Sequence, residues 1–116
     1  MTLPRDAMLL RILIGEDDKC EGRPLYETLV LRAREAGIAG ATVLRGPMGF
    51  GHSSRLHTAK ILRLSSDLPL VIEIVDSEER IKAFLPTLDA IMPSGLVTLE
   101  KVQVLHYGKH VKHDPA

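Results

Sequence analysis

The sequence has few cysteines, few aromatic residues and no excess of either charge, and each of these features excludes a kind of function. Its single cysteine, Cys20, rules out an intrachain disulfide and a zinc site built from several cysteines. Aromatic residues make up only 3%, too few for the stacking surfaces that hold single-stranded nucleic acids. Neither sign of charge is in excess, with 15 Lys and Arg against 15 Asp and Glu, so no overall basic field attracts nucleic acid. We therefore expect no nucleic-acid partner.

Long apolar runs are also missing. No stretch approaches the roughly 20 residues that a membrane-spanning helix needs, and the start of the chain lacks the apolar segment and cleavage site of a signal peptide. We therefore expect a cytoplasmic protein without direct membrane insertion. A chain of 116 residues fits a single domain, residues 1–116, with a core over about 7–107 and a tail over 108–116.

The first half of the chain reads as a strand, a helix and a second strand. Residues 7–15 form an apolar run broken only by Arg11, which is typical of a strand covered on both faces. A polar connection over 16–23 leads to a helix with Pro24 in its first turn and Gly37 as its C-terminal cap. Residues 41–44 begin a second strand, for which 56–64 is a candidate returning arm. The apolar stripe of the helix consists of Leu25, Leu29, Ala33 and Ala36.

The second half has the same order of strand, helix and strand. A turn over 65–67 precedes a third strand over 68–76, which is dense in β-branched residues. Asp76 or Ser77 can cap the following helix, and Asp76 with Glu79 matches a capping box. Pro86 should kink this helix or remove one of its hydrogen bonds, and 93–95 should end it. The last strand covers 96–107, with a bulge expected near Glu100 because the apolar phase shifts there. The buried stripe of this second helix is Ile81, Phe84, Leu85, Leu88, Ile91 and Met92.

The order β-α-β-β-α-β predicts an α+β fold, a ferredoxin-like sandwich with an antiparallel sheet and both helices on one face. The predicted strands are apolar at both alternations, apart from Arg11 and Glu73. Two helices cover only one side of a sheet, so the other side should pack against another copy of the chain.

The segment from Arg45 to His57 is the candidate functional loop. It joins two apolar segments and contains three glycines, two arginines, two histidines and a pair of serines. Arg45 and Arg55 flank Gly46, Gly49 and Gly51, whose N–H groups could face an anion or whose flexibility could only relax the turn. Arginine beside such groups favours an anion, above all phosphate. A long projecting loop between strands two and three follows from this pattern.

Several motifs together resemble domain-of-unknown-function family 190, a PII-like family. They are Gly15-Glu16-Asp17-Asp18, Gly22-Arg23-Pro24-Leu25-Tyr26, the run from Gly37 to Val43, Arg45-Gly46 with Gly49-Phe50-Gly51, Leu68-Pro69, and the run from Ile72 to Ser77. This resemblance extends over about residues 9–105 and implies relatedness to the PII signalling proteins. It implies a homotrimer that binds an adenine nucleotide between subunits and engages a target protein, such as a membrane transporter, through the long loop.

Two departures from PII proteins modify that expectation. Residues 92–95 contain no Lys or Arg where PII proteins supply basic residues to the phosphates, and the glutamine at the loop base is missing. A smaller nucleotide or another small anion suits the reduced positive charge better. The residues expected to bind ligand are Glu16, Asp17, Arg23, Tyr26, Arg45, Gly46, Gly49, Phe50, Gly51 and Arg55.

The acidic turn and the tyrosine in this set have alternative roles. Carboxylates at the end of the first strand could hold a ribose hydroxyl or a divalent ion, or form a solvated acidic turn. Tyr26 could stack on a base or pack at the start of the helix, and packing is favoured.

Two other functions stay open. A trimeric divalent-metal-binding protein resembling the cation-tolerance proteins would use histidines such as His106, His110 and His113, although a polar tail explains these three as well. A hydrolase of a phosphorylated small molecule is the other alternative. No catalytic constellation is evident, because Ser53 lies in no G-x-S-x-G motif and the chain has no asparagine for acylphosphatase chemistry, so we expect no enzyme.

Overall fold

A four-stranded antiparallel sheet forms the centre of the computed structural model, which describes residues 3–49, 57–58 and 68–108. Its strands are β1 (Asp6–Gly15), β4 (Ala41–Arg45), β7 (Pro69–Asp76) and β8 (Leu96–Gln103), in the spatial order β4-β7-β1-β8. The two long central strands, β1 and β7, pair over eight residues, from Met8 opposite Asp76 to Gly15 opposite Pro69. This order is that of the ferredoxin-like fold, which confirms the predicted class.

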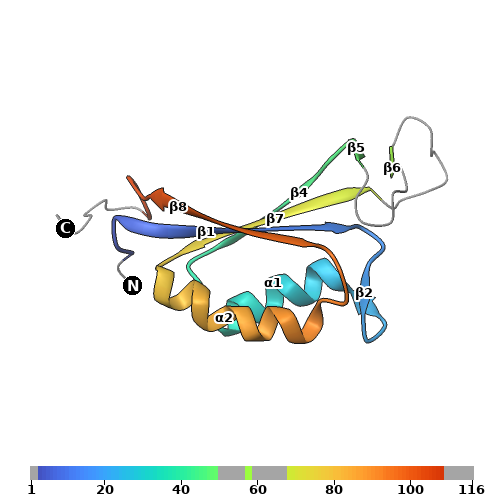
Figure 1. Ribbon diagram of the computed structural model, residues 1–116, viewed down its shortest axis with the longest axis horizontal. Helices are drawn as coiled ribbons and strands as arrows, with labels where there is room; N and C mark the ends of the chain where they lie inside the picture. Colours follow the sequence, from blue (N-terminus) through green and yellow to red (C-terminus); the bar gives the residue numbers. More distant parts are fainter. Residues whose placement is uncertain (1–2, 50–56, 59–67, 109–116) are drawn as a thin grey trace.

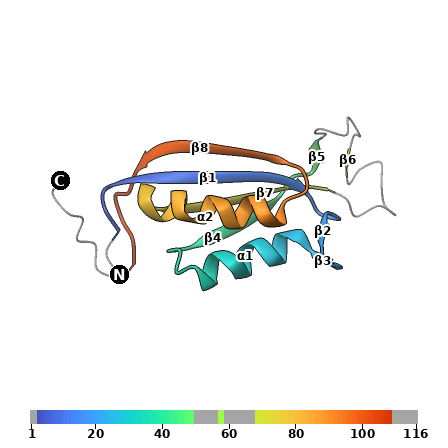
Figure 2. The ribbon, with the colours of Figure 1, turned by 60° about the horizontal axis from the view of Figure 1, so that its bottom comes forward.

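Both helices, α1 (Leu25–Glu35) and α2 (Glu78–Ile91), lie on one side of the sheet (Figures 1 and 2). Alternate residues of the central strands point toward them and form the core, because side chains two apart on a strand share a face. None of the helices in the described part of the chain is long and apolar enough to cross a membrane. The core residues are Met8, Leu10, Ile12, Ile14, Leu25, Leu29, Ala33, Leu70, Ile72, Ile74, Ile81, Phe84 and Leu88.

The end of α1 matches the prediction. Gly37 has φ +76° and follows the last helical turn, while the N–H of Ile38 donates to the carbonyl of Ala33 (3.1 Å). The N–H of Gly37 donates to the carbonyl of Arg34 (3.1 Å), so the pair of bonds forms a Schellman motif. The position of Pro24 differs slightly from the prediction, because Pro24 is the N-cap residue and lies just before the first turn.

Of the two cap residues predicted for α2, Ser77 is confirmed, and the capping box of Asp76 with Glu79 is wrong. Ser77 is the N-cap, and its hydroxyl accepts a hydrogen bond from the N–H of Arg80 (3.2 Å). Asp76 is only 1% exposed, and its carboxylate accepts from the N–H groups of Ser77 (2.7 Å) and Ala39 (2.9 Å). Asp76 therefore ties the end of β7 to the segment that enters β4. The helix continues through Pro86, which has no N–H to donate to the preceding turn.

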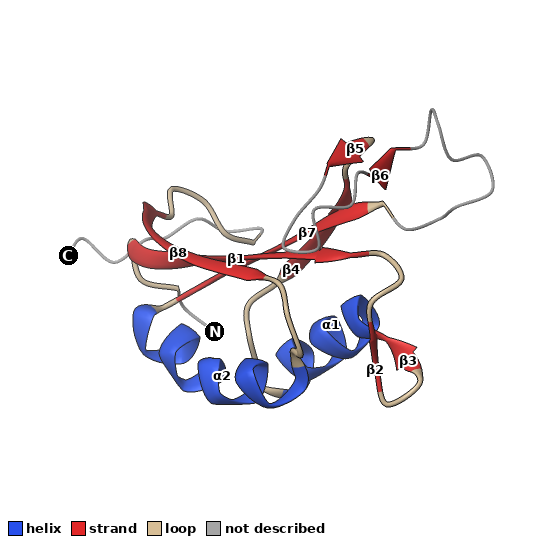
Figure 3. Ribbon diagram, turned by 45° about the vertical axis from the view of Figure 1, so that its right-hand side comes forward, coloured by secondary structure: helices blue, strands red, loops and turns tan. Residues whose placement is uncertain are grey.

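Two further elements differ from the prediction, and a third is described only in part. The polar connection contains a small hairpin, β2 (Lys19–Cys20) and β3 (Arg23–Pro24), beside α1 (Figure 3). Strand β8 ends at Gln103 and pairs with β1 in one unbroken register, so the bulge near Glu100 is wrong. The apolar phase shifts without a bulge because both faces of β8 are largely exposed in the single chain. Within the expected returning arm, β6 (His57–Thr58) pairs with β5 (Met48–Gly49), and the rest lies outside the described residues.

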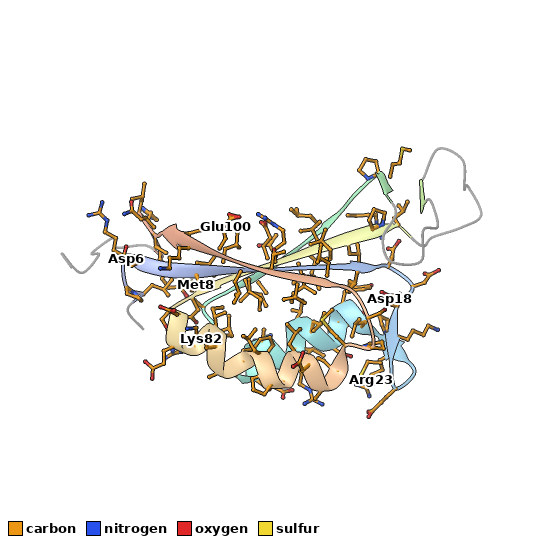
Figure 4. The ribbon with its side chains drawn as sticks, viewed as in Figure 1. Asp6, Met8, Asp18, Arg23, Lys82 and Glu100 are labelled. Carbon is orange, nitrogen blue, oxygen red and sulfur yellow. The ribbon has the colours of Figure 1, made fainter. Side chains whose placement is uncertain are left out.

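The sheet face opposite the helices, here called the open face, has a polar row across its middle. Arg11 of β1 pairs with Glu73 of β7 (Nη2–Oε2 2.9 Å) and approaches Glu100 of β8 (3.7 Å). Thr98 and Thr42 extend this row to the two edge strands, as the strand register places them opposite Arg11 and Glu73. Glu100 projects from this face in Figure 4. Apolar side chains lie on either side of the row: Leu9 and Val75 on one side, and Leu13, Leu44, Val71 and Leu96 on the other.

Candidate functional site

The base of the long loop is fixed to the first residues of β7. The N–H of Glu16, directly after β1, donates to the carbonyl of Leu68 (2.8 Å). The N–H of Gly46, directly after β4, donates to the carbonyl of Pro69 (2.7 Å). The ends of β1 and β4 thus flank the start of β7, which brings residues distant in the sequence to one end of the sheet.

An ion pair crosses this end of the sheet. The guanidinium of Arg45 donates from Nη2 to Oε2 of Glu16. The register explains the meeting, because Arg45 and Ile14 both lie opposite Leu70, and Glu16 follows Ile14 by two residues on the same face. The Arg45 side chain is 60% exposed and that of Glu16 only 14%, so the cation reaches solvent while its partner is nearly covered.

Gly46 and Gly49 enclose Pro69. A Cβ atom on Gly46 would lie 3.0 Å from Cγ of Pro69, and one on Gly49 would lie 3.1 Å from the same atom. These glycines permit close packing of the loop base on β7. Two roles were open for these glycines, presenting N–H groups to an anion or relaxing the turn. The N–H of Gly46 donates to the carbonyl of Pro69, so Gly46 has a structural role here.

The acidic turn is shaped by Asp18. Its carboxylate accepts from the N–H of Gly15 (2.9 Å), and its carbonyl accepts from the N–H of Leu25 (2.7 Å). These two hydrogen bonds to Asp18 fix the end of β1 relative to the start of α1. Asp17 lies exposed in the same turn.

Arg23 and Tyr26 lie apart from the loop base. Glu21 (φ +51°) and Gly22 (φ +80°) form the tip of the β2–β3 hairpin with the two positive φ angles of a type I′ turn, which places the exposed Arg23 beside α1 (Figure 4). Tyr26 is partly buried against the core. The structure thus brings together Glu16, Arg45, Gly46 and Gly49, with Asp17 in the adjoining turn. Phe50, Gly51 and Arg55 lie outside the described residues, as do Ser53, His52, His110 and His113.

A hollow on the open face was not anticipated from the sequence. It has a volume of about 680 Å³ and lies between residues 39–42, at the start of β4, and residues 102–107, which are the last two residues of β8 and the segment after it. Its remaining lining comes from Leu3, Leu9, Glu73 and Val75. In the sequence, the only pointer to this region was the Gly37–Val43 motif. Its role in lining the hollow depends on the contact of Ala39 with Tyr107, more than 60 positions later.

Residues 104–108, here called the strap, follow β8, and residues 104–107 line the hollow. The N–H of Val104 donates to the carbonyl of Arg5 (2.7 Å), and the hydroxyl of Tyr107 donates to the carbonyl of Ala39 (3.0 Å). A ring nitrogen of His106 lies 2.8 Å from the carbonyl oxygen of Gly108. Among the described residues, no group of three His, Cys, Asp or Glu side chains is arranged to hold a metal ion.

Solved structures with the same fold are PII-like proteins. CPII, a nitrogen regulatory PII-like protein from Thiomonas intermedia K12 bound to ADP, AMP and bicarbonate, matches with a TM-score of 0.59 and 21% identity, covering 85% of this chain and 88% of that one. CPII bound to ADP and bicarbonate gives a TM-score of 0.54 and 24% identity, with the same coverage. The fold is therefore PII-like, as the sequence motifs implied.

Sequence relatives are more similar but uncharacterised. A UPF0166 protein of Aquifex aeolicus is 45% identical over 98 residues, covering 84% of this chain and 92% of that protein. A UPF0166 protein of Methanocaldococcus jannaschii is 38% identical over 99 residues, covering 84% and 91%. The family model DUF190, described as an uncharacterized ACR, matches residues 7–104. The chain therefore belongs to the DUF190 family.

Proposed function

We propose that this protein is a trimeric PII-like regulator that binds a small anionic ligand, an adenine nucleotide, between subunits. The loop over 45–57 then docks on a protein partner, such as a membrane transporter. The observation that carries the proposal is the exposed guanidinium of Arg45 at the base of the long loop. An arginine in this position can hold a phosphate with two parallel hydrogen bonds. The solved structures of CPII, with the same fold, hold ADP, AMP and bicarbonate.

The hollow on the open face supplies the second half of the proposed site. Its volume of about 680 Å³ lies in the range of small-molecule pockets, and its lining mixes apolar side chains with the hydroxyl of Thr42 and the carboxylate of Glu73. Thr42 faces the open side, since it lies opposite Glu73, whereas Arg45 faces the helix side. In one chain, the hollow and the loop base therefore face opposite sides of the sheet. In the proposed assembly, the hollow of one subunit and the loop base of its neighbour hold one nucleotide.

The distribution of exposed apolar residues supports self-association. Nine large apolar side chains, counting Tyr107, are exposed among the described residues, and eight of them lie on the edge strands β4 and β8 or in the segments that follow them. The exception is Leu31 on α1. Large apolar patches of this kind usually mark interfaces, and identical chains with two such edges can close a ring.

A thermal-shift panel tests ligand binding. ATP, ADP, AMP, cyclic nucleotides, bicarbonate and divalent cations are added separately and in combination. A ligand at about 100 times its Kd stabilises the native state by roughly 2.7 kcal/mol, enough to raise the Tm by several degrees. We expect an adenine nucleotide to give this shift, whereas a shift with divalent cations alone would favour the metal-binding alternative.

Arg45→Ala identifies the phosphate contact. The substitution should weaken nucleotide binding at least tenfold without changing the oligomeric mass, because it removes a charged partner of the phosphate. Arg32→Ala, which removes an exposed guanidinium from α1, is the control and should bind nucleotide as the parent does. Equal affinity of the two variants would contradict the assignment of Arg45.

A further inference from the structure

Glu16 holds the position that an anionic ligand of Arg45 would need. Its carboxylate already accepts a hydrogen bond from Nη2 of Arg45, and its own N–H is fixed to the carbonyl of Leu68. The Glu16 side chain is only 14% exposed, so it approaches Arg45 from the covered side of the loop base. The structure therefore contains a carboxylate that competes with any external anion for the same guanidinium.

We infer that Glu16 is a specificity-determining residue that acts as a built-in competitor for Arg45. This inference rests on the proposed function of Arg45 as the phosphate contact. A ligand must replace the carboxylate at the guanidinium, so the Glu16–Arg45 pair lowers the affinity of Arg45 for the ligand. The attraction of Arg45 for a ligand grows with the ligand's charge, whereas the loss of the Glu16 pair is a fixed cost. Phosphate-bearing ligands with two or more negative charges overcome that cost, and singly charged anions do not.

The same competition connects the ligand to the loop. Arg45 is the last residue of β4 and Gly46 begins the long loop, so the Glu16–Arg45 pair joins the start of the loop to the end of β1. When a phosphate takes Arg45, this connection is released, while the backbone bond from Gly46 to Pro69 stays in place. Ligand binding and the Glu16–Arg45 pair are thus mutually exclusive states of the loop base.

Glu16→Gln tests this competition, because glutamine keeps the shape of the side chain and removes its charge. Calorimetric titration with ADP should show binding about two- to fivefold tighter than in the parent, the range expected for loss of one competing, partly exposed ion pair. Glu21→Gln removes one negative charge from the exposed hairpin tip and should leave the affinity unchanged. In an Arg45→Ala background, Glu16→Gln should have no effect on the affinity.

Chemical modification provides a readout without ligand. Phenylglyoxal reacts with accessible guanidinium groups, and peptide mass spectrometry measures the rate at Arg45. We expect this rate to rise several-fold in Glu16→Gln and to stay unchanged in Glu21→Gln. Saturating ADP should protect Arg45 in both the parent and Glu16→Gln.

Two results would overturn the inference. Weaker ADP binding by Glu16→Gln would mean that Glu16 contacts the ligand, and equal binding with equal Arg45 reactivity would mean that the pair does not compete. Loss of ADP binding in Arg45→Ala together with either result leaves the proposed function intact. If the parent itself binds no ADP, the proposed nucleotide function fails, and the same titration with inorganic phosphate decides the competition: no gain in Glu16→Gln overturns it.

Discussion

Tyr107 and Ala39 are 68 residues apart in the sequence and are joined by one hydrogen bond, from the tyrosine hydroxyl to the alanine carbonyl at 3.0 Å. Ala39 is also held from the other side, since its N–H donates to the buried carboxylate of Asp76. The short segment before β4 is therefore clamped between the end of β7 and the strap. Because residues 39–42 line the hollow, the shape of the hollow depends on both contacts.

Removal of the tyrosine hydroxyl should loosen the strap without unfolding the domain. In Tyr107→Phe, the amide of Val104, which donates to Arg5, should exchange with solvent up to about tenfold faster, since one hydrogen bond contributes roughly 0.5–1.5 kcal/mol. The amide of Ile81, at the start of α2, serves as the internal control and should keep its rate. An unchanged rate at Val104 would show that the strap does not depend on this bond.

Alanine at Gly46 or Gly49 should destabilise the loop base. The new Cβ atom would lie 3.0 or 3.1 Å from Cγ of Pro69, and relief of such crowding against a rigid ring costs about 1–3 kcal/mol. Urea unfolding measures this loss. Gly40→Ala is the matched control, because its Cβ would meet nothing within 4 Å. Similar stabilities for all three variants would contradict the close packing of the loop base on Pro69.

Asp76→Asn should reduce stability although it preserves shape. The carboxylate uses both oxygens, one toward Ser77 and one toward Ala39, and an amide side chain has only one oxygen to offer. One buried N–H group then lacks its acceptor, which lowers the free energy of unfolding by about 1–3 kcal/mol. Asp89→Asn, at an exposed position of α2, should change the free energy of unfolding little. Equal losses in both variants would show that Asp76 has no special structural role.

A charge on the open face should disrupt the proposed trimer. Leu44 on β4 and Leu31 on α1 are each 50% exposed, so Leu44→Lys and Leu31→Lys make the same chemical change at equal exposure. We expect Leu44→Lys to lower the oligomeric mass in light scattering, because an unpaired ammonium cannot be buried in an apolar interface without a large cost. Leu31→Lys should keep the parent mass. Dissociation of both variants, or of neither, would contradict the location of the interface.

The sequence was sufficient to predict the core because the core depends on periodicity. Alternation in β1 and β7 and the helical stripe of α1 are local patterns that packing preserves. The cap at Gly37 could be predicted for the same reason, because the positive φ angle that often ends a helix is a local requirement that glycine meets. The Pro93-Ser94-Gly95 stop agrees with the end of α2 at Ile91 and with φ +125° at Gly95.

The errors arose where a residue's role is decided by distant contacts. Asp76 looked like a helix cap, but the N–H of Ala39 competes for its carboxylate. Arg45 and Glu16 were both expected at the site, yet their pairing depends on the strand register, which the sequence does not reveal. The hairpin tip at Glu21 requires a positive φ at a residue other than glycine, and no propensity favours that.

Strand β7 holds the loop base and the hollow, the two halves of the candidate site, at a fixed distance from each other. It is paired on both sides, with eight residues of β1 and five of β4, and a slip by one residue would turn its buried side chains to the open face. Its eight residues therefore act as a rigid spacer of about 23 Å between Pro69 at the loop base and Asp76 near the hollow. A signal from one end to the other within a single chain cannot travel by sliding of this strand. The proposed release of the Glu16–Arg45 pair would therefore leave the strand register and the backbone bond from Gly46 to Pro69 unchanged.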